Sequence, residues 1–237
     1  NRQRNTPSLL DSAQARWLGW GGSHDSLWAA SLTPLLADGE MHQTLSSLAQ
    51  RLRSTPELAQ GYQAAFGQPP PSDDATLAVD VTKALAAYQS TLVSARTPFD
   101  AFRDAIARGD NAAAATYPPA AQRGLRLFIG EGRCTVCHAG PRFTNGEFAD
   151  IGVPFFTPGG VDSGRYSGLQ QLLRSDHNRL GPFNDAGAKD PRAVSTRHVI
   201  LEPRHFGEFR VPSLRNLKET APYMHNGSQQ TLREVLR

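Results

Sequence analysis

The sequence Cys134-Thr135-Val136-Cys137-His138 places two cysteines and a histidine at a fixed, short spacing. In a C-x-x-C-H motif the two thiols add to the vinyl groups of a haem, and the adjacent histidine lies beneath the iron. The chain has only these two cysteines, so no disulfide framework competes for them. The motif therefore predicts one covalently attached c-type haem with His138 as an axial iron ligand.

Three other uses of the motif fit the sequence less well. A structural zinc site takes four ligands, and the chain has neither a second cysteine pair nor a close histidine pair. A thioredoxin-like redox pair is expected inside a βαβ unit, and no strand alternation marks one here. A disulfide between Cys134 and Cys137 would leave His138 unexplained.

Helical periodicity surrounds the motif, whereas no stretch alternates convincingly as a strand. Residues 1–40 and 140–212 are expected to be mostly irregular, and 111–119 to form a linker. Helices are predicted over 43–54, 56–67, 73–95, 97–109, 120–129 and 169–174. The helix over 73–95 has an apolar face made of Leu77, Val81, Leu85, Tyr88 and Leu92. We therefore expect a mostly α protein with long loops that wrap around a haem.

A haem iron takes a sixth ligand or keeps an open site, and methionine and histidine are the usual ligands. The chain has only two methionines. Met224 lies in a loop between Pro222 and Gly227, which would fix the direction of a side chain. His225 competes for the same role, and a loop methionine is also common in packing, so composition alone leaves the choice open.

Composition excludes some classes of protein. The 237 residues suit one large or two small domains, with 39% hydrophobic and 20% charged residues. The net charge of +3 is scattered, so nucleic-acid binding has no support. No apolar stretch approaches the roughly 18 residues of a membrane span. We expect that Asn1 and Arg237 are not the natural ends. The sequence begins without an initiator methionine, and a T-x-x-E capping box formed by Thr231 and Glu234 starts a helix without a stop signal.

Several stretches resemble bacterial di-haem cytochrome c peroxidases, a superfamily that includes MauG-type enzymes. Residues 209–216 (F-R-V-P-S-L-R-N) and 220–227 (T-A-P-Y-M-H-N-G) are similar to the family's C-terminal haem domain. Residues 4–10 (R-N-T-P-S-L-L) are similar to its R-N-T-P-S-L segment. Trp20-Gly21-Gly22 lies where the family has W-D-G-R, and 32–41 is similar to a loop ending in an E-M pair.

The resemblance implies a two-domain di-haem peroxidase architecture with cytochrome c-like haem domains. Residues 1–117 would be the remainder of the N-terminal, peroxidatic domain, and 118–237 the C-terminal cytochrome c domain. Cys134 and Cys137 would hold the electron-transferring haem, with His138 proximal and Met224 distal. MauG-type enzymes have a tyrosine at the Met224 position, so Met224 favours a peroxidase.

The resemblance also implies roles outside the C-x-x-C-H motif. Trp20 would carry electrons between two haems, and Glu40 would be the acid–base over the peroxidatic haem. The Asn5 side chain would bind Ca²⁺ together with backbone oxygens of Arg210 and Pro212, and oxygen ligands suit that cation. Without the resemblance, Trp20 would be taken for a packed aromatic, Glu40 for a solvated carboxylate and Asn5 for a turn residue.

One departure from the family pattern concerns the first haem. The family has a second C-x-x-C-H upstream of the R-N-T-P segment, and this chain has none. Because Trp20 and Glu40 have a purpose only beside that haem, we expect the natural protein to contain it. Gly21 in place of the family's aspartate is a smaller departure.

The expected function is reduction of hydrogen peroxide by a periplasmic oxidoreductase, with electrons from a small c-type cytochrome or a cupredoxin. The periplasm is expected because this type of haem attachment takes place outside the bacterial cytoplasm. One alternative is a MauG-like enzyme that oxidises side chains of a partner protein. It is favoured by the stretches 162–166, 180–185 and 196–198, which resemble a subgroup associated with copper-binding peptide systems. The other alternative is a mono-haem electron-transfer module, and a homodimer remains open.

Overall fold

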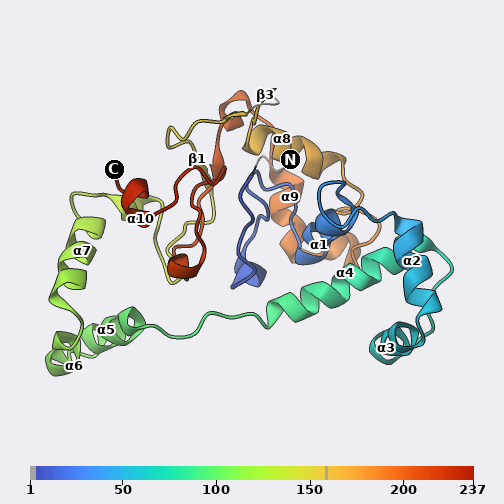
Figure 1. Ribbon diagram of the computed structural model, residues 1–237, viewed down its shortest axis with the longest axis horizontal. Coiled ribbons are helices and arrows are strands. Elements are labelled where there is room, and N and C mark those ends of the chain that lie inside the picture. Colours follow the sequence, from blue (N-terminus) through green and yellow to red (C-terminus); the bar gives the residue numbers. More distant parts are fainter. Residues whose placement is uncertain (1–3, 158–159) are drawn as a thin grey trace. The chain divides into compact units, whose positions relative to one another are not determined.

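The computed structural model describes residues 4–157 and 160–237. Its packing divides the chain into two compact units, whose α-helices are labelled in Figure 1. Unit 1 comprises Asn1–Leu92, Phe148–Arg210 and Thr220–Arg237, and unit 2 comprises Val93–Glu147 and Val211–Glu219. Helices are the main regular structure in both units, which confirms the mostly α prediction.

The first part of unit 1 is a group of packed helices. They are α1 (Leu27–Leu36), α2 (Leu45–Ser54), α3 (Pro56–Phe66) and α4 (Asp74–Ser90). The side chains of Ser26, Thr44 and Asp73 accept hydrogen bonds from the first turns of α1, α2 and α4, as N-caps do. Gly67 ends α3 in the left-handed region, with φ of 72°. Helices α2, α3 and α4 pack around Ala49, Tyr62 and Leu77, and α1 packs on α4.

Two predictions for this region were wrong. Residues 27–36 form α1, although 1–40 was expected to be irregular, because Ser26 caps an apolar stretch that packs on α4 despite Pro34. Helix α4 ends at Ser90 rather than 95, and Tyr88 on its expected apolar face is 65% exposed. Leu77 of that face is buried as expected, and the buried side of α4 also includes Val79 and Thr82, because α1 and α2 pack on this helix.

The remainder of unit 1 is built from short elements joined by loops. Strand β1 (Phe148–Ala149) pairs antiparallel with β4 (Phe209–Arg210), and β2 (Phe156–Thr157) pairs with β3 (Gly160–Val161). The short helices are η1 (Ser12–Gln14), α8 (Arg165–Arg174), η3 (Gly187–Lys189), η4 (Pro191–Ala193), α9 (Val194–His198), η5 (Pro203–His205) and α10 (Leu232–Val235). Trp17 packs with Leu169 and Leu172 of α8 in a second small core.

Unit 2 contains the C-x-x-C-H motif. It consists of α5 (Pro98–Ala107), α6 (Asn111–Ala115), α7 (Pro119–Ile129), η2 (Cys134–Val136) and η6 (Leu217–Glu219). Helix α6 replaces part of the expected linker, because Asp110 accepts a hydrogen bond from Ala113 N and four alanines follow Asn111. The rings of Phe102 and Tyr117 stack with centroids 4.7 Å apart.

The expected domain boundary between residues 117 and 118 lies inside unit 2. The units are defined by packing and the expected domains by resemblance, so that boundary stays a prediction. In the described ranges, no helix combines the length and apolar character that a membrane span needs.

Candidate functional site

The C-x-x-C-H motif forms a tight turn after α7. Arg133 has a left-handed backbone, with φ of 51°, and starts η2. The backbone N–H groups of Cys137 and His138 both donate to the oxygen of Cys134, at 3.3 and 2.8 Å. Both cysteines are half-buried and form no disulfide with each other. The turn therefore brings the backbone of both cysteines and of His138 together in one compact loop.

The ring of His138 is oriented by a backbone carbonyl. Its Nδ1 lies 2.9 Å from the oxygen of Phe143. Because a carbonyl only accepts hydrogen bonds, Nδ1 carries the proton and Nε2 keeps its lone pair. Histidines that bind metals usually donate their other ring N–H in this way, which fixes both tautomer and orientation. The residues present therefore fit a haem held by Cys134, Cys137 and His138.

Phe143 has an unusual backbone for a bulky residue, with φ of 53°. Its N–H donates to Gly140 O at 3.0 Å, which closes the turn. Its ring packs against Phe99 of α5 and Phe128 of α7, with centroid separations of 5.1 and 6.1 Å. These contacts hold the residue in the conformation that directs its carbonyl at His138.

Side chains of the segment 211–219 hold the loop that carries Phe143 through hydrogen bonds to its backbone. Ser213 Oγ donates to Arg142 O at 2.8 Å, and Arg215 Nε donates to Pro141 O at 2.7 Å. Arg215 Nη1 and Nη2 donate to the two carboxylate oxygens of Asp100 at 3.0 and 2.7 Å. Hydrogen bonds from Arg215 are the main reason why the pKa of Asp100 lies far below its usual range. The sequence showed Ser213 and Arg215 only as letters of a family motif, and no local signal indicated these partners.

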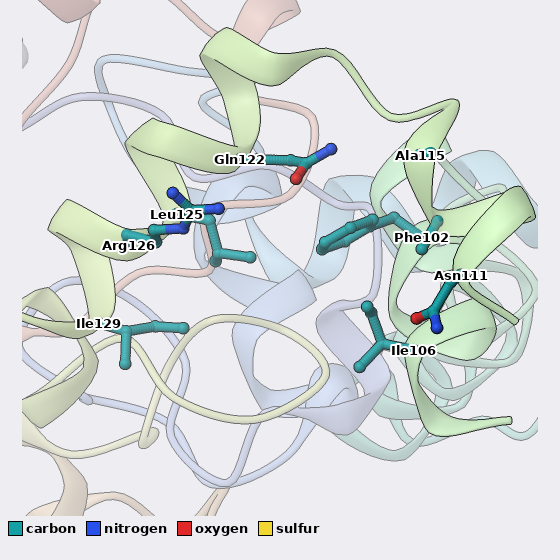
Figure 2. Close-up of a pocket in the computed structure, with 9 residues that line it drawn as sticks. Phe102, Ile106, Asn111, Ala115, Gln122, Leu125, Arg126 and Ile129 are labelled. Atoms are coloured by element: carbon teal, nitrogen blue, oxygen red, sulfur yellow. The ribbon is translucent and has the colours of Figure 1, made fainter. Parts of the chain in front are cut away.

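A cavity of about 390 Å³ lies between the helices of unit 2 (Figure 2). Phe102 and Ile106 of α5 and Leu125 and Ile129 of α7 give it an apolar lining, and Figure 2 shows Arg126 beside Leu125. Helix α7 leads directly into the C-x-x-C-H turn. None of the site residues expected from the sequence lines this cavity.

In unit 1, Trp20 and Asn5 are joined directly. The indole Nε1 of Trp20 donates to the backbone oxygen of Asn5 at 2.7 Å. The backbone oxygen of Trp20 accepts from Arg210 N at 2.8 Å, so two of the expected calcium ligands are linked through the tryptophan. The side-chain nitrogen of Asn5 donates to Pro222 O, two residues before Met224.

The turn after Trp20 explains why this chain has glycine where the family has aspartate. A Cβ atom at Gly21 would lie 2.5 Å from Gly164 O, so no larger residue fits without movement. Arg165, at the start of α8, is 3% exposed and donates to Gly21 O and Gly22 O at 3.2 and 3.0 Å. Its guanidinium also lies 4.5 Å from the ring centroid of Trp17 and 4.0 Å from that of Phe148.

Met224 lies in a narrow hairpin. Tyr223 pairs with Gln229, and Met224 itself has a left-handed backbone with φ of 70°. The next residue, His225, is 5% exposed and stacks on Phe209 with ring centroids 3.5 Å apart. Burial lowers the pKa of His225, against the opposing effect of Asp162. His225 is thus engaged in packing inside unit 1.

The expected site residues are divided between the units. Glu40 is exposed in the turn after α1 and belongs to unit 1, as do Trp20, Asn5, Arg210 and Met224. Cys134, Cys137, His138 and Pro212 belong to unit 2. Among the described residues, no group of three or more His, Cys, Asp or Glu side chains could hold a metal ion. The roles expected for these residues stay predictions.

Comparison with known proteins adds a second kind of observation. Residues 1–108 match the family model described as di-haem cytochrome c peroxidase. The chain is 35% identical over 237 residues to cytochrome-c peroxidase IdrP1 of Pseudomonas sp. strain SCT, covering 98% of this chain and 58% of that protein. Over almost its whole length the chain is thus similar to members of the di-haem cytochrome c peroxidase and MauG superfamily.

Other superfamily members extend the likeness to MauG. Methylamine utilization protein MauG of Methylorubrum extorquens is 34% identical, over 98% of this chain and 54% of that protein. A solved MauG-like protein associated with microbial copper homeostasis is 27% identical with a TM-score of 0.60, covering 99% of this chain and 61% of that one. The diheme peroxidase BthA of Burkholderia thailandensis has a TM-score of 0.71 at 23% identity, covering 99% and 57%, and shows the fold alone. The chain thus spans little more than half the length of its curated relatives.

Proposed function

We propose that this chain is part of a periplasmic di-haem cytochrome c peroxidase that reduces hydrogen peroxide with electrons received through its C-terminal haem. The observation that carries the proposal is the hydrogen bond between His138 Nδ1 and Phe143 O inside the C-x-x-C-H turn. It leaves Nε2 as the iron-binding atom, as a c-type haem requires. Relatives named cytochrome-c peroxidase at 35% identity support the same activity.

Bound haem supplies the electron transfer and peroxide chemistry, and the protein supplies ligands and orientation. Cys134 and Cys137 hold the haem of this chain through thioethers, and His138 with Met224 ligates its iron. A methionine ligand raises the reduction potential, which suits a haem that accepts electrons. Trp20 conducts electrons toward a second, peroxidatic haem, and its indole is held in place by Asn5 O. Glu40 moves the proton between the peroxide oxygens, as a general acid–base does.

The proposal extends to the organisation of the protein. Residues 1–117 belong to the peroxidatic domain and 118–237 to a cytochrome c-like domain. A Ca²⁺ ion is bound by Asn5, Arg210 and Pro212, and a small c-type cytochrome or a cupredoxin is the electron donor. The family has its first haem motif upstream of residues 4–10, so the second haem is expected in the full-length protein.

A MauG-like oxidation of a partner protein is the second candidate. The relative named MauG at 34% identity and the solved MauG-like protein associated with copper homeostasis favour it. Met224 favours the peroxidase, because MauG-type enzymes have tyrosine at that position. A mono-haem electron-transfer module would be favoured if the full-length protein contained no second C-x-x-C-H.

The test uses the full-length protein and three measurements. A pyridine haemochrome assay counts the haems, optical and EPR spectra before and after peroxide report ligation, and peroxide consumption is followed against a reduced cytochrome c. Two haems, one of them methionine-ligated, with rapid cytochrome oxidation support the peroxidase. Slow cytochrome oxidation with modification of a partner protein supports the MauG-like enzyme. A single, low-spin haem that is inert to peroxide overturns both.

A further inference from the structure

Arg215 uses its whole guanidinium group to connect two parts of unit 2. Nη1 and Nη2 donate hydrogen bonds to the two carboxylate oxygens of Asp100, and Nε donates to Pro141 O at 2.7 Å. The side chains are buried, with 14% of Arg215 and 5% of Asp100 exposed. Asp100 is itself fixed, because its carboxylate accepts from Thr97 N at the start of α5. The loop is therefore anchored to a helix terminus through one arginine.

The anchored loop ends at the residue that orients His138. Pro141 and Arg142 are held by Arg215 and Ser213, and Phe143 follows directly. Phe143 is in the left-handed region, with φ of 53°, which is an unfavourable conformation for a bulky residue. Such a conformation persists only where the surroundings impose it. If the anchor were lost, the loop could relax to an ordinary φ, and the Phe143 carbonyl would turn away from Nδ1.

The orientation of this carbonyl has a chemical consequence. An acceptor on Nδ1–H makes the imidazole a stronger electron donor to a metal on Nε2, which stabilises the oxidised iron. Removing the acceptor therefore raises the reduction potential. General loosening of the site has the opposite sign, since water near the haem stabilises the more highly charged oxidised form. The sign of the shift separates the two effects.

We propose that Arg215 is a positioning residue which, through the loop 139–143 and the Phe143 carbonyl, sets the reduction potential of the haem attached next to His138. This inference rests on the proposed function, because it assumes a haem at the C-x-x-C-H motif. Lysine cannot replace Arg215, because an ammonium group cannot bind the carboxylate at two points and reach Pro141 O as well.

The test compares reduction potentials of the C-terminal haem in the full-length protein by spectroelectrochemistry. Arg215→Lys is expected to shift the potential upward while the haem stays covalently attached. The matched control is Arg103→Lys, because Arg103 also contacts Asp100, at 3.3 Å, but donates its other hydrogen bonds to Asp104. The control is expected to keep the wild-type potential.

A milder variant covers the case in which Arg215→Lys does not fold. Ser213→Ala removes the hydrogen bond to Arg142 O and the one that Ser213 Oγ accepts from Arg215 N at 3.2 Å, but it leaves the Arg215 side chain in place. It is expected to cause a smaller upward shift. If each variant that folds has an unchanged or lowered reduction potential, the inference is overturned. The proposed function is not affected by that result. A wild-type protein without covalent haem at Cys134 and Cys137 overturns the proposed function as well.

Discussion

The indole nitrogen of Trp20 donates a 2.7 Å hydrogen bond to the backbone oxygen of Asn5, fifteen residues earlier in the chain. The backbone N–H of Asn5 in turn donates a 2.7 Å hydrogen bond to the oxygen of His225, in the hairpin that carries Met224. The proposed electron conductor, a proposed calcium ligand and the hairpin of the proposed distal ligand are thus joined by two hydrogen bonds. A change at any of them is expected to affect the others.

The first prediction concerns Trp20→Phe, which keeps an aromatic ring and removes the N–H donor. Loss of the hydrogen bond is expected to cost about 1 kcal/mol of unfolding free energy. Peroxide turnover with a reduced cytochrome should fall about tenfold, equivalent to ~1.4 kcal/mol in the barrier. Trp28→Phe is the control, because Trp28 is a half-buried tryptophan of α1 that contacts His177. Equal turnover in the two variants would contradict a conducting role for Trp20.

The second prediction is that restoring the family's residue at position 21 harms this protein. In Gly21→Asp the new Cβ would lie 2.5 Å from Gly164 O, a backbone atom that cannot rotate away. We expect a loss of about 1–3 kcal/mol in unfolding free energy, the usual cost of overpacking, measured by urea denaturation. Gly39→Asp adds the same side chain where nothing lies within 4 Å, and it should be nearly neutral. A Gly21→Asp variant as stable as wild type would show that α8 is not packed so closely on this turn.

The third prediction addresses Arg165→Lys. The variant keeps the charge but loses the flat group that lies over the rings of Trp17 and Phe148. Since the arginine also donates to Gly21 O and Gly22 O, we expect a loss of about 2 kcal/mol or more, seen as a lower Tm. Arg174→Lys, at the exposed end of the same helix, serves as the control. Equal Tm values for the two variants would argue against a structural role for the buried guanidinium.

The chemistry of the motif was predictable because it is local. Two thiols and an imidazole within five residues define a haem attachment whatever the surrounding fold. Helices α2 and α3 were predicted nearly to the residue. The helical spacing of Leu45, Leu48 and Leu52 indicated α2, and Pro56 at the first position of α3 is also a local signal. Helix α1 was missed because Pro34 lies inside it and because its residues are apolar on nearly all sides, so that no helical period stands out.

The contacts that hold the loop beside His138 could not be predicted, because the residues that make them are far apart in the sequence. Arg215 and Asp100 are separated by 115 positions. Phe143 gives no sign in the sequence of its left-handed backbone, which packing of Phe99 and Phe128 imposes. The glycine at position 21 was noted as a departure, and its cause emerged only from the approach of Gly164.

The final prediction is a loss of stability in mild acid caused by His24. Burial lowers its pKa from 6.5 to about 4, against a raising effect of Asp25 and with a further lowering by His177. Its Nε2 lies 3.0 Å from Thr33 Oγ1. Because the unfolded chain takes up this proton at a higher pH than the folded chain, the stabilising contribution is complete above pH 6.5 and is lost as the pH falls toward 4. The loss should approach about 2–3 kcal/mol.

Urea denaturation at a series of pH values measures this effect. His24→Gln should reduce the slope between pH 6.5 and 4, because glutamine takes up no proton there, whereas the contribution of His177 and His225 to the slope remains. His198→Gln removes an exposed histidine and should leave the wild-type slope. Should His24→Gln retain the full slope, the proton responsible would belong to another group. His177 would be examined next, because burial lowers its pKa as well and it stacks on Phe183 with ring centroids 5.0 Å apart.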